Sequence, residues 1–458
     1  MTLLEILITI TILILTAGFV LLAVVSIREK HHRAARLGFL FAILSILFGI
    51  AVYFSPQWVQ ITFTGLLGTA FLISLILVFW PPRSVIQPSP HPNAQVDERT
   101  ILFARALLQP STPQFDAYYQ DHPDHLPLDN AFRNQPGLLT PGASFYDDFL
   151  AASPLGSFFL TEQLRDAVDG PIAPRTISGP PEKHTKFIKD LAHYHGAVDV
   201  GICYLKPYHI YSHIGRGSGE YGAPISLDHQ FAIAFTVEMS HEMINTAPQL
   251  PGVMESAKQY VESAKIAVQL AAAIRQFGYP ARAHIDGNYR VIAPLVAKDA
   301  GLGEIGRMGL LMTPGLGPRV RLGVVTTDLP LCIDQPTFNP SVIDFCLHCQ
   351  KCAAVCPSSA IPFGDRQVYE DGTFRWKINA ERCYTYWTKI GTDCGRCMAV
   401  CPYAHPDAFL HNLIRFGVNH SSNFRRAAIV MDDLFYGVKP RPHAYPDWLE
   451  DLKSQPKK

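Results

Sequence analysis

Eight of the ten cysteines lie in two runs toward the C-terminal end of the chain. The first run has the spacing C-x2-C-x2-C-x3-C-P, and the second has C-x2-C-x3-C-P with one further cysteine upstream. The first run consists of Cys346, Cys349, Cys352 and Cys356, and the second of Cys383, Cys394, Cys397 and Cys401. Thiolates at this spacing can wrap a short loop around one iron–sulfur cube. Eight of them therefore predict two [4Fe–4S] clusters.

The order of the cysteines also predicts which of them share a cluster. In the bacterial ferredoxin pattern, the fourth cysteine of each run ligates the other cluster. We therefore assign cluster 1 to Cys346, Cys349, Cys352 and Cys401, and cluster 2 to Cys356, Cys383, Cys394 and Cys397. A zinc site or a disulfide framework is less favoured, because zinc usually takes paired C-x2-C knuckles and disulfides belong to small secreted domains. Cys203 and Cys332 remain, and we expect them to be small buried apolar residues.

The first 80 residues carry three long apolar segments without charge, Ile6 to Ile27, Leu37 to Phe54 and Ile61 to Trp80. Each is long enough for a helix that crosses about 30 Å of hydrocarbon, the second only just. We predict three transmembrane helices. A signal peptide would explain only the first segment, which has no basic n-region, and the alternative for the second is a buried hairpin partner.

The loops between these segments predict their orientation. Residues 28–36 contain four Lys or Arg, whereas residues 55–60 contain none. The positive-inside rule places the basic loop in the cytoplasm, so that the N-terminus lies outside and everything after Trp80 is cytoplasmic. Trp58 and Trp80 lie at span ends, where an interfacial aromatic belt would place them. We therefore expect a multi-pass protein of the cytoplasmic membrane, with the lipid bilayer as one partner.

Composition gives the organisation of the rest. The chain has 39 basic and 39 acidic residues, so no overall charge points to a nucleic acid partner. A Pro/Ser-rich stretch after the third segment predicts a semi-rigid linker. We predict these parts: 1–82 three transmembrane helices, 83–96 linker, 97–230 an N-terminal part of the functional core, 231–340 the centre of that core, 341–408 a ferredoxin-like module, and 409–458 a segment that completes the core.

The core should be of the α/β class. Phe231 to Thr236 and Leu322 to Thr327 are short apolar, β-branched runs of the buried-strand type. Between them, small or apolar residues recur in steps of three and four from Val253 to Ile274, as on one face of a helix. Tyr260 lies on this face, so its hydroxyl must find a partner inside the protein or line a cavity. His241 and His284 could line a cavity too, although a lone histidine is more often structural.

Two glycine-rich stretches follow, from Gly301 to Gly309 and from Thr313 to Arg321. The first contains G-x-G-x-x-G, but no strand precedes it and no acidic residue ends a second strand beyond it, so a dinucleotide site is disfavoured. We expect these glycines to let the backbone approach a large flat ligand closely.

Several motifs together resemble the catalytic subunits of cobalamin-dependent reductive dehalogenases. They are Gly278-Tyr279, Asp286-Gly287-Asn288, Ala300 to Arg307, Gly317 to Arg321, Thr327 to Leu331, the two cysteine runs, and a similar N-terminal stretch that starts at Asp97. The resemblance covers nearly all of the chain from Asp97 onward.

The resemblance implies a nitroreductase-like α/β core that encloses a base-off cobalamin, with a module of two [4Fe–4S] clusters beside it. It implies removal of halide from an organohalide by two electrons and one proton. The family's proton-donating tyrosine corresponds to Tyr260, its asparagine to Asn288 and its cationic residue to Arg321. Cobalamin contacts are expected in the glycine-rich region, at Met308, Leu310, Thr313 and Pro318.

This sequence departs from the family in its membrane part. Typical members carry a twin-arginine export signal and use a separate membrane anchor, whereas here three apolar segments precede the core. The electron donor is expected to be a low-potential ferredoxin, a flavodoxin or a quinol-linked membrane protein. The substrate, aromatic or aliphatic, chlorinated or brominated, is left open, as is a homodimer.

Two other functions are alternatives to this one. An epoxyqueuosine-reductase-like enzyme would share the cobalamin and the clusters, but it acts on transfer RNA and should be soluble with a basic surface. A membrane-bound ferredoxin-type electron carrier without cobalamin would leave the core residues unexplained.

Overall fold

The computed structural model describes residues 2–79, 86–336 and 338–452. The chain divides into two compact units. The helical unit comprises Met1–Ile86 and Asp407–Arg441, and the core unit comprises Gln87–Pro406 and Pro442–Lys458. Trp80 and the start of the predicted linker lie outside the described residues.

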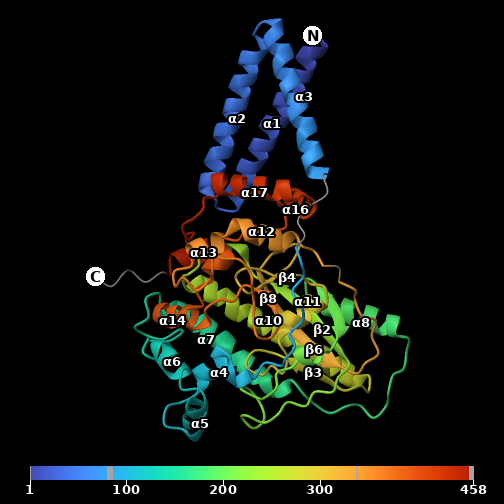
Figure 1. Ribbon diagram of the computed structural model, residues 1–458, viewed down its shortest axis with the longest axis vertical. Helices are drawn as coiled ribbons and strands as arrows, with labels where there is room; N and C mark the ends of the chain where they lie inside the picture. Colours follow the sequence, from blue (N-terminus) through green and yellow to red (C-terminus); the bar gives the residue numbers. More distant parts are fainter. Residues whose placement is uncertain (1, 80–85, 337, 453–458) are drawn as a thin grey trace. The chain divides into compact units, whose positions relative to one another are not determined.

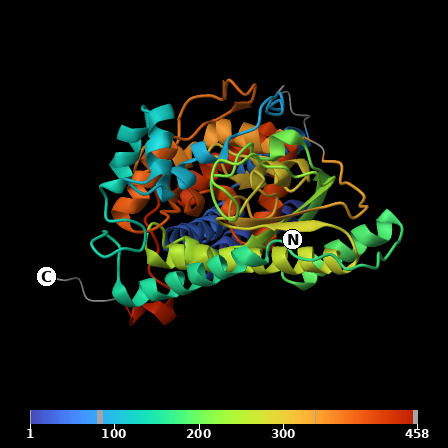
Figure 2. The same ribbon diagram turned by 90° about the horizontal axis from the view of Figure 1, so that it is seen from below.

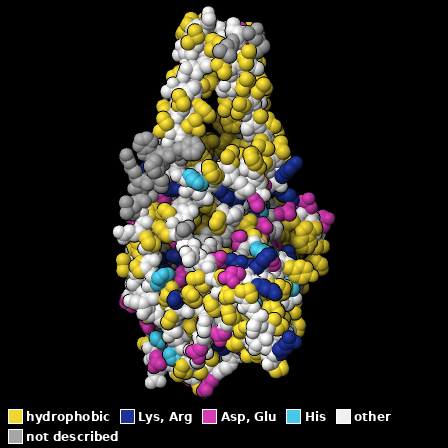
Figure 3. Space-filling view, turned by 90° about the vertical axis from the view of Figure 1, so that its right-hand side faces the viewer, with side chains coloured by type: hydrophobic (Ala, Val, Ile, Leu, Met, Phe, Trp, Pro, Cys, Tyr) yellow, Lys and Arg dark blue, Asp and Glu magenta, His cyan; other side chains and the backbone are white. Residues whose placement is uncertain are grey.

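The helical unit contains three helices that are long and apolar enough to cross a membrane: α1 (Leu3–Arg28), α2 (His32–Tyr53) and α3 (Gln57–Phe79). The three predicted apolar segments are thus confirmed as long helices, as far as their residues are described. Their outward-facing side chains are mostly hydrophobic (Figure 3). Two shorter helices complete the unit, α16 (Phe409–His420) and α17 (Ser422–Phe435) (Figure 1).

Small residues let α1 and α2 pack closely. Gly38 lies against Ala23, and a Cβ on this glycine would approach the Phe19 carbonyl oxygen to 3.0 Å. Further along the pair, the hydroxyls of Thr16 and Ser45 hydrogen-bond at 2.7 Å. Small residues and interhelical hydroxyl bonds are the means by which helices associate where no hydrophobic effect drives them together.

The core unit is built on an antiparallel sheet with strand order β1-β2-β6-β3. Its strands are β1 (Val200–Tyr204), β2 (Phe231–Glu238), β3 (Ala281–His284) and β6 (Val320–Thr327). The two predicted strands are confirmed as β2 and β6, which pair along their whole length. The predicted central part of the core is 231–340. Strand β1 precedes residue 231 and belongs to the same sheet, so this sheet begins earlier in the chain than that part.

Helices cover both faces of this sheet. The long helix α10 (Leu250–Gln276) packs on one face with a fully buried row that includes Ala264, Ala267 and Leu270, and this confirms the predicted helix. Helix α7 (Asp148–Gln163) runs beside α10 (Figure 2). Helix α11 (Ala293–Asp299) covers the other face. The result is a layered arrangement of helix, sheet and helix.

The remaining elements of the core unit surround this centre. On the N-terminal side they are η1 (Glu98–Thr100), α4 (Leu102–Leu107), α5 (Pro113–Asp121), α6 (His125–Arg133), η2 (Leu164–Ala167), α8 (Pro181–Tyr194), η3 (Pro207–His209), α9 (His241–Ile244), β4 (Glu304–Ile305) and β5 (Leu311–Met312). The cysteine region forms α12 (Ser341–Cys349), α13 (Lys351–Val355), β7 (Gln367–Val368), β8 (Phe374–Arg375), α14 (Ala380–Ile390), α15 (Arg396–Ala399) and η4 (Pro402–Ala404), and α18 (Asp447–Glu450) follows near the C-terminus.

The C-terminal segment divides differently from the prediction. We expected residues 409–458 to complete the core, but α16 and α17 cluster with the helical unit. His411 forms an ion pair with Glu29 at 2.8 Å, and the ring of Phe435 lies edge-on to Phe41 at 5.9 Å. Of the described residues in the segment 409–458, only those from Pro442 onward belong to the core unit. There Tyr445 and Leu449 pack into an apolar cluster.

The close approach of α1 and α2 gives a stability prediction. Gly38→Leu should destabilise the helical unit by about 1–3 kcal/mol, because the added side chain meets Ala23 and backbone atoms of α1. The measurement is the thermal midpoint of the full chain in detergent. Gly18→Leu is the matched control, since a Cβ there meets nothing within 4 Å. Equal midpoints for the two variants would contradict close packing of α1 on α2.

Candidate functional site

The eight cysteines of the two runs converge in the core unit as two neighbouring sets. Burial raises the pKa of Cys401 well above its ordinary value, and the thiols of Cys346, Cys349 and Cys352 raise it further. Burial likewise raises the pKa of Cys397, which is raised further by Cys394, Cys352, Cys383 and Cys356. These neighbours match the predicted sets, and Cys352 also places the sets next to each other. The assignment of ligands to clusters stays a prediction.

The chemistry of this donor set suits iron–sulfur clusters. Burial raises the pKa of Cys352 and Cys394 to about 12 and that of Cys383 to about 11, so bare thiolates would be costly here. Bound iron supplies the positive charge that stabilises thiolates in such a place. Sequence order alone does not bring Cys383 to its partners; helix α14 does, because it carries this residue.

Arg307 is a fully buried cation beside the first set. Its guanidinium donates to the carbonyl oxygens of Cys346 (2.9 Å), Pro362 (2.7 Å) and Gly364 (2.8 Å). It also lies over the Trp376 ring, with Cζ 4.6 Å from the ring centroid. Arg307 therefore holds helix α12, which carries Cys346, against the segment that follows Cys356. Arg307 ends the motif Ala300 to Arg307, and no local sequence pattern predicts its role.

Two glycines of the first glycine-rich stretch, Gly301 to Gly309, lie close to another part of the chain. A Cβ on Gly303 would lie 2.2 Å from the Met312 carbonyl oxygen, and one on Gly306 would lie 2.8 Å from the Met312 side chain. Both glycines thus serve the tight β4–β5 hairpin. In the second stretch, a Cβ on Gly317 would meet Tyr403 at 2.5 Å. At these three positions the expected approach to a flat ligand is corrected to an approach to the chain itself.

A cavity of about 440 Å³ opens beside the second cysteine set. Its wall includes Cys356, Cys383, Cys394 and Cys397, together with a largely apolar surface from Ile244, Ala247, Met308, Leu310, Ile378 and Met398. A cavity of this size with an apolar wall is typical of a cofactor or ligand site.

A second cavity, of about 240 Å³, shares six lining residues with the first: Ile101, Phe103, Tyr211, Leu310, Arg321 and Met398. Its polar residues are Tyr211, Tyr260, Tyr289, Arg216, Asp286 and Arg321. The structure thus brings Tyr260 and Arg321 together at one cavity, and the shared residues place this cavity beside the one that holds the cysteines.

Arg321 organises this cavity. Its Cζ lies 4.4 Å from the centroid of the Tyr260 ring, and its Nη2 donates to the Ser256 hydroxyl at 2.7 Å. The same nitrogen lies 3.4 Å from a carboxylate oxygen of Asp393, which also accepts a hydrogen bond from Ser256. Ser256 could have been found from the sequence, because it precedes Tyr260 by one helical turn. No local signal marked Asp393 or Arg216.

The electrostatics favour a protonated Tyr260. The Arg321 guanidinium lowers the pKa of Tyr260, but burial and the carboxylates of Asp286 and Asp393 raise it by more. The pKa of the phenol therefore lies above its ordinary value. Burial raises the pKa of Tyr289 as well. Both phenols are neutral at physiological pH and can donate a proton.

Asn288 lies outside the residues that line these two cavities in the described part. Its Oδ1 accepts from Arg282 at 2.8 Å, and its Nδ2 donates to the Arg165 carbonyl oxygen at 2.9 Å. These bonds hold the turn that leads to Tyr289. Asn288 is thus placed to position Tyr289, and its side chain is engaged elsewhere than at Tyr260.

The predicted cobalamin contacts separate in the same way. Met308 lines the larger cavity, Pro318 lines the smaller one, and Leu310 lines both. Thr313 is fully buried, and its hydroxyl donates to the Gly317 carbonyl oxygen at 3.1 Å. Thr313 therefore closes a turn, and it is not among the described residues that line these two cavities.

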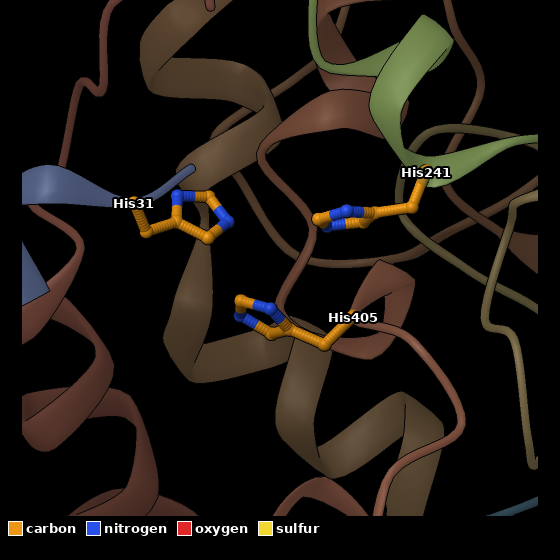
Figure 4. A group of neighbouring side chains, drawn as sticks. All are labelled: His31, His241 and His405. Atoms are coloured by element: carbon orange, nitrogen blue, oxygen red, sulfur yellow. The ribbon is translucent and has the colours of Figure 1, made fainter. Parts of the chain in front are cut away.

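The two histidines and the two remaining cysteines have structural surroundings. His284 is fully buried and bonded to Thr326 at 2.9 Å and to the Arg290 amide at 3.1 Å. His241 bonds to Asn245 at 2.9 Å, and its ring lies 6.1 Å from that of His405 in the same unit (Figure 4). Cys203 is buried, as expected, and Cys332 is half-buried.

Known proteins are similar to this chain over the cysteine region and over part of the rest. Residues 345–405 match the family model of the 4Fe-4S dicluster domain. The chain is 34% identical over 231 residues to the tetrachloroethene reductive dehalogenase of Sulfurospirillum multivorans, which is 47% of this chain and 46% of that protein. The chain thus spans less than half the length of this curated relative.

Solved structures give the same picture. The structure of the catabolic reductive dehalogenase NpRdhA is similar, with a TM-score of 0.64, 28% identity, and coverage of 78% of this chain and 50% of that one. A second reductive dehalogenase structure, described as suggesting a mechanism for B12-dependent dehalogenation, has a TM-score of 0.64 and 28% identity over 78% of this chain and 49% of that chain.

The buried guanidinium of Arg307 gives a prediction that does not depend on activity. Arg307→Met should cost about 1–3 kcal/mol for each carbonyl that loses its donor and stays buried, and iron should be lost with it. Iron per chain and the thermal midpoint measure this effect. Arg366→Met in the same region is the control, because Arg366 donates to the single carbonyl of Gln87. Unchanged iron and midpoint in Arg307→Met would contradict the assigned role.

Proposed function

We propose that the chain is a membrane-anchored reductive dehalogenase, an enzyme that reductively removes halide from an organohalide, and its similarity to reductive dehalogenases in sequence and in fold supports this proposal. The reaction is R–X + 2e⁻ + H⁺ → R–H + X⁻. The observation that carries the proposal is the cavity at which Tyr260 and Arg321 meet, directly beside the cavity walled by the second cysteine set.

The cofactors proposed are two [4Fe–4S] clusters and one base-off cobalamin in a nitroreductase-like core. Four thiolates would hold each cluster, with the ligands assigned above. Met308, Leu310 and Pro318 would contribute to the apolar wall around the corrin, since they line the two joined cavities. When bound, these groups supply low-potential electrons for breaking the carbon–halogen bond.

The chain's own residues supply the proton and the electrostatics. Tyr260 holds a proton on its phenol oxygen because its pKa lies above the ordinary value. Arg321, stacked on the ring and fixed by Ser256 and Asp393, stabilises the phenolate that forms when the proton is given up. Arg216 lies in the same wall, where its guanidinium pairs with the buried carboxylate of Glu98 at 3.1 Å. The apolar walls limit water.

The three apolar helices would anchor the enzyme in the cytoplasmic membrane as a multi-pass protein. The basic residues 28–36 favour the cytoplasmic side for the end of α1 and the start of α2, and thus for the core unit. The donor would be a low-potential ferredoxin, a flavodoxin or a quinol-linked membrane protein. A homodimer is compatible with this arrangement.

The first test is metal content and halide release. Protein purified without oxygen and supplied with cobalamin should contain about eight irons and one cobalt per chain. With a low-potential chemical reductant it should release halide from some members of a panel that spans chlorinated and brominated, aliphatic and aromatic compounds. Eight irons without cobalt, and no halide release, would contradict the proposal and favour an electron carrier.

The role of Tyr260 predicts a large loss on removal of its hydroxyl. Tyr260→Phe should lower the rate of halide release by roughly 10²-fold or more, while iron and cobalt content stay at the wild-type level. Tyr289→Phe is the matched control, because Tyr289 lines the same cavity. A greater loss of halide-release rate in Tyr289→Phe than in Tyr260→Phe would assign the role of proton donor to Tyr289 instead.

The pKa of Tyr260 predicts the form of the pH profile. Because this pKa is raised, the phenol stays protonated through neutrality, and its loss should lower the rate only above about pH 10. Arg321→Gln removes the charge that lowers the pKa, so the alkaline limb should move to still higher pH and the plateau rate should fall. Arg321→Lys should restore part of the rate. An alkaline limb that moves to lower pH in Arg321→Gln would be inconsistent with this role.

A further inference from the structure

The helices α16 and α17 expose apolar stripes. On α16, Phe409, Leu413 and Phe416 recur at helical spacing, and Phe409 and Leu413 are 76% and 56% exposed. On α17, Val430 is 66% exposed, and Met431 and Leu434 lie beside it on the same face. The polar residues His411, Arg415 and Arg425 are buried instead. This distribution is the reverse of that expected for helices on a water-facing surface.

Contacts within the helical unit fix where these stripes lie. The ion pair of His411 with Glu29 joins α16 to the residue that follows α1, and the ring contact of Phe435 with Phe41 joins α17 to the first half of α2. The ring of Tyr436 also lies edge-on to His31 at 4.9 Å. Within this unit, α16 and α17 lie across the ends of α1–α3 (Figure 1). Their stripes therefore continue the apolar surface of the three long helices.

Exposed basic residues border the stripes at the same end. Arg28 is the last residue of α1, and Arg33 and Arg36 lie near the start of α2. Arg426 and Lys439 belong to α17 and to the segment after it, and a Cβ on Gly437 would lie 3.4 Å from the Arg33 guanidinium. Apolar stripes bordered by Lys and Arg are the pattern of a helix that lies in the membrane interface.

We infer that α16 and α17 form an interfacial pair, whose apolar stripes enter the acyl boundary of the bilayer while the basic residues meet anionic phospholipid headgroups. The inference rests on the proposed anchoring by α1–α3 and adds a second membrane contact, made by residues 407–441. A bilayer fits this face better than a second protein chain, because the stripes are continuous with helices that are apolar all round.

Photocrosslinking of the full chain in nanodiscs tests this inference. The discs contain phosphatidylcholine and phosphatidylglycerol, and p-benzoylphenylalanine replaces Leu413 or Val430 in separate proteins. Lipid adducts, detected by mass spectrometry of the labelled peptides, are expected at both positions. The apolar reference is Phe159 on α7 of the core unit, which is 62% exposed and should give no lipid adduct.

A third position separates the inference from the anchoring on which it rests. Ile14 on α1 is 66% exposed and should give lipid adducts if α1 crosses the bilayer. Adducts at Ile14 but not at Leu413 or Val430 would overturn the inference and leave the anchoring intact. No adducts at Ile14 would overturn both. Protein–protein adducts in place of lipid adducts at Leu413 and Val430 would assign this face to a second chain.

The headgroup part has its own readout. Replacing phosphatidylglycerol by phosphatidylcholine should lower the adduct yield at Leu413 and Val430 and leave the yield at Ile14 unchanged. The reason is that the basic border would lose its anionic partner while the hydrocarbon layer stays the same. If the adduct yield at Leu413 and Val430 is the same with and without phosphatidylglycerol, the proposed contact with anionic headgroups is wrong.

Discussion

The guanidinium of Arg321 joins three parts of the core unit that are far apart in the chain. It projects from β6, stacks on Tyr260 of α10, and bonds to Ser256 one turn earlier on that helix. Its ion pair with Asp393 reaches the residue before Cys394. One cation thus connects the sheet, the helix that carries the proposed proton donor, and the loop that carries a proposed cluster ligand. A shift of any of these parts would disturb the other two.

Two further buried arginines attach the cysteine region to the core. Arg319, next to the strand that carries Arg321, donates to the Ala404 carbonyl oxygen at 2.9 Å and pairs with Glu238 at 2.6 Å. Arg307 holds the carbonyl of Cys346. Because a guanidinium has several donors in a fixed fork, it can satisfy several buried backbone oxygens at once. The cysteine sets are therefore held by hydrogen bonds that do not depend on bound iron.

The helical unit unites the two ends of the chain. Segments separated by several hundred residues meet where Glu29 pairs with His411 and Phe41 contacts Phe435. The apolar character of this unit is thus not confined to the first 80 residues. This arrangement ties the segment that follows the cysteine region to the proposed membrane anchor.

The sequence by itself determined the local features: the cysteine spacing, the three long apolar helices, the strands β2 and β6, and the helix that carries Tyr260. Each depends on residues close together in the chain, where spacing and periodicity express the local geometry directly. The tertiary structure decided which distant residues meet. It placed Arg321 on Tyr260, turned Asn288 toward Arg282 and Arg165, and packed Gly317 against Tyr403. It also assigned residues 407–441 to the helical unit. These outcomes depend on burial and on hydrogen bonds between segments far apart in sequence, and no local pattern records them.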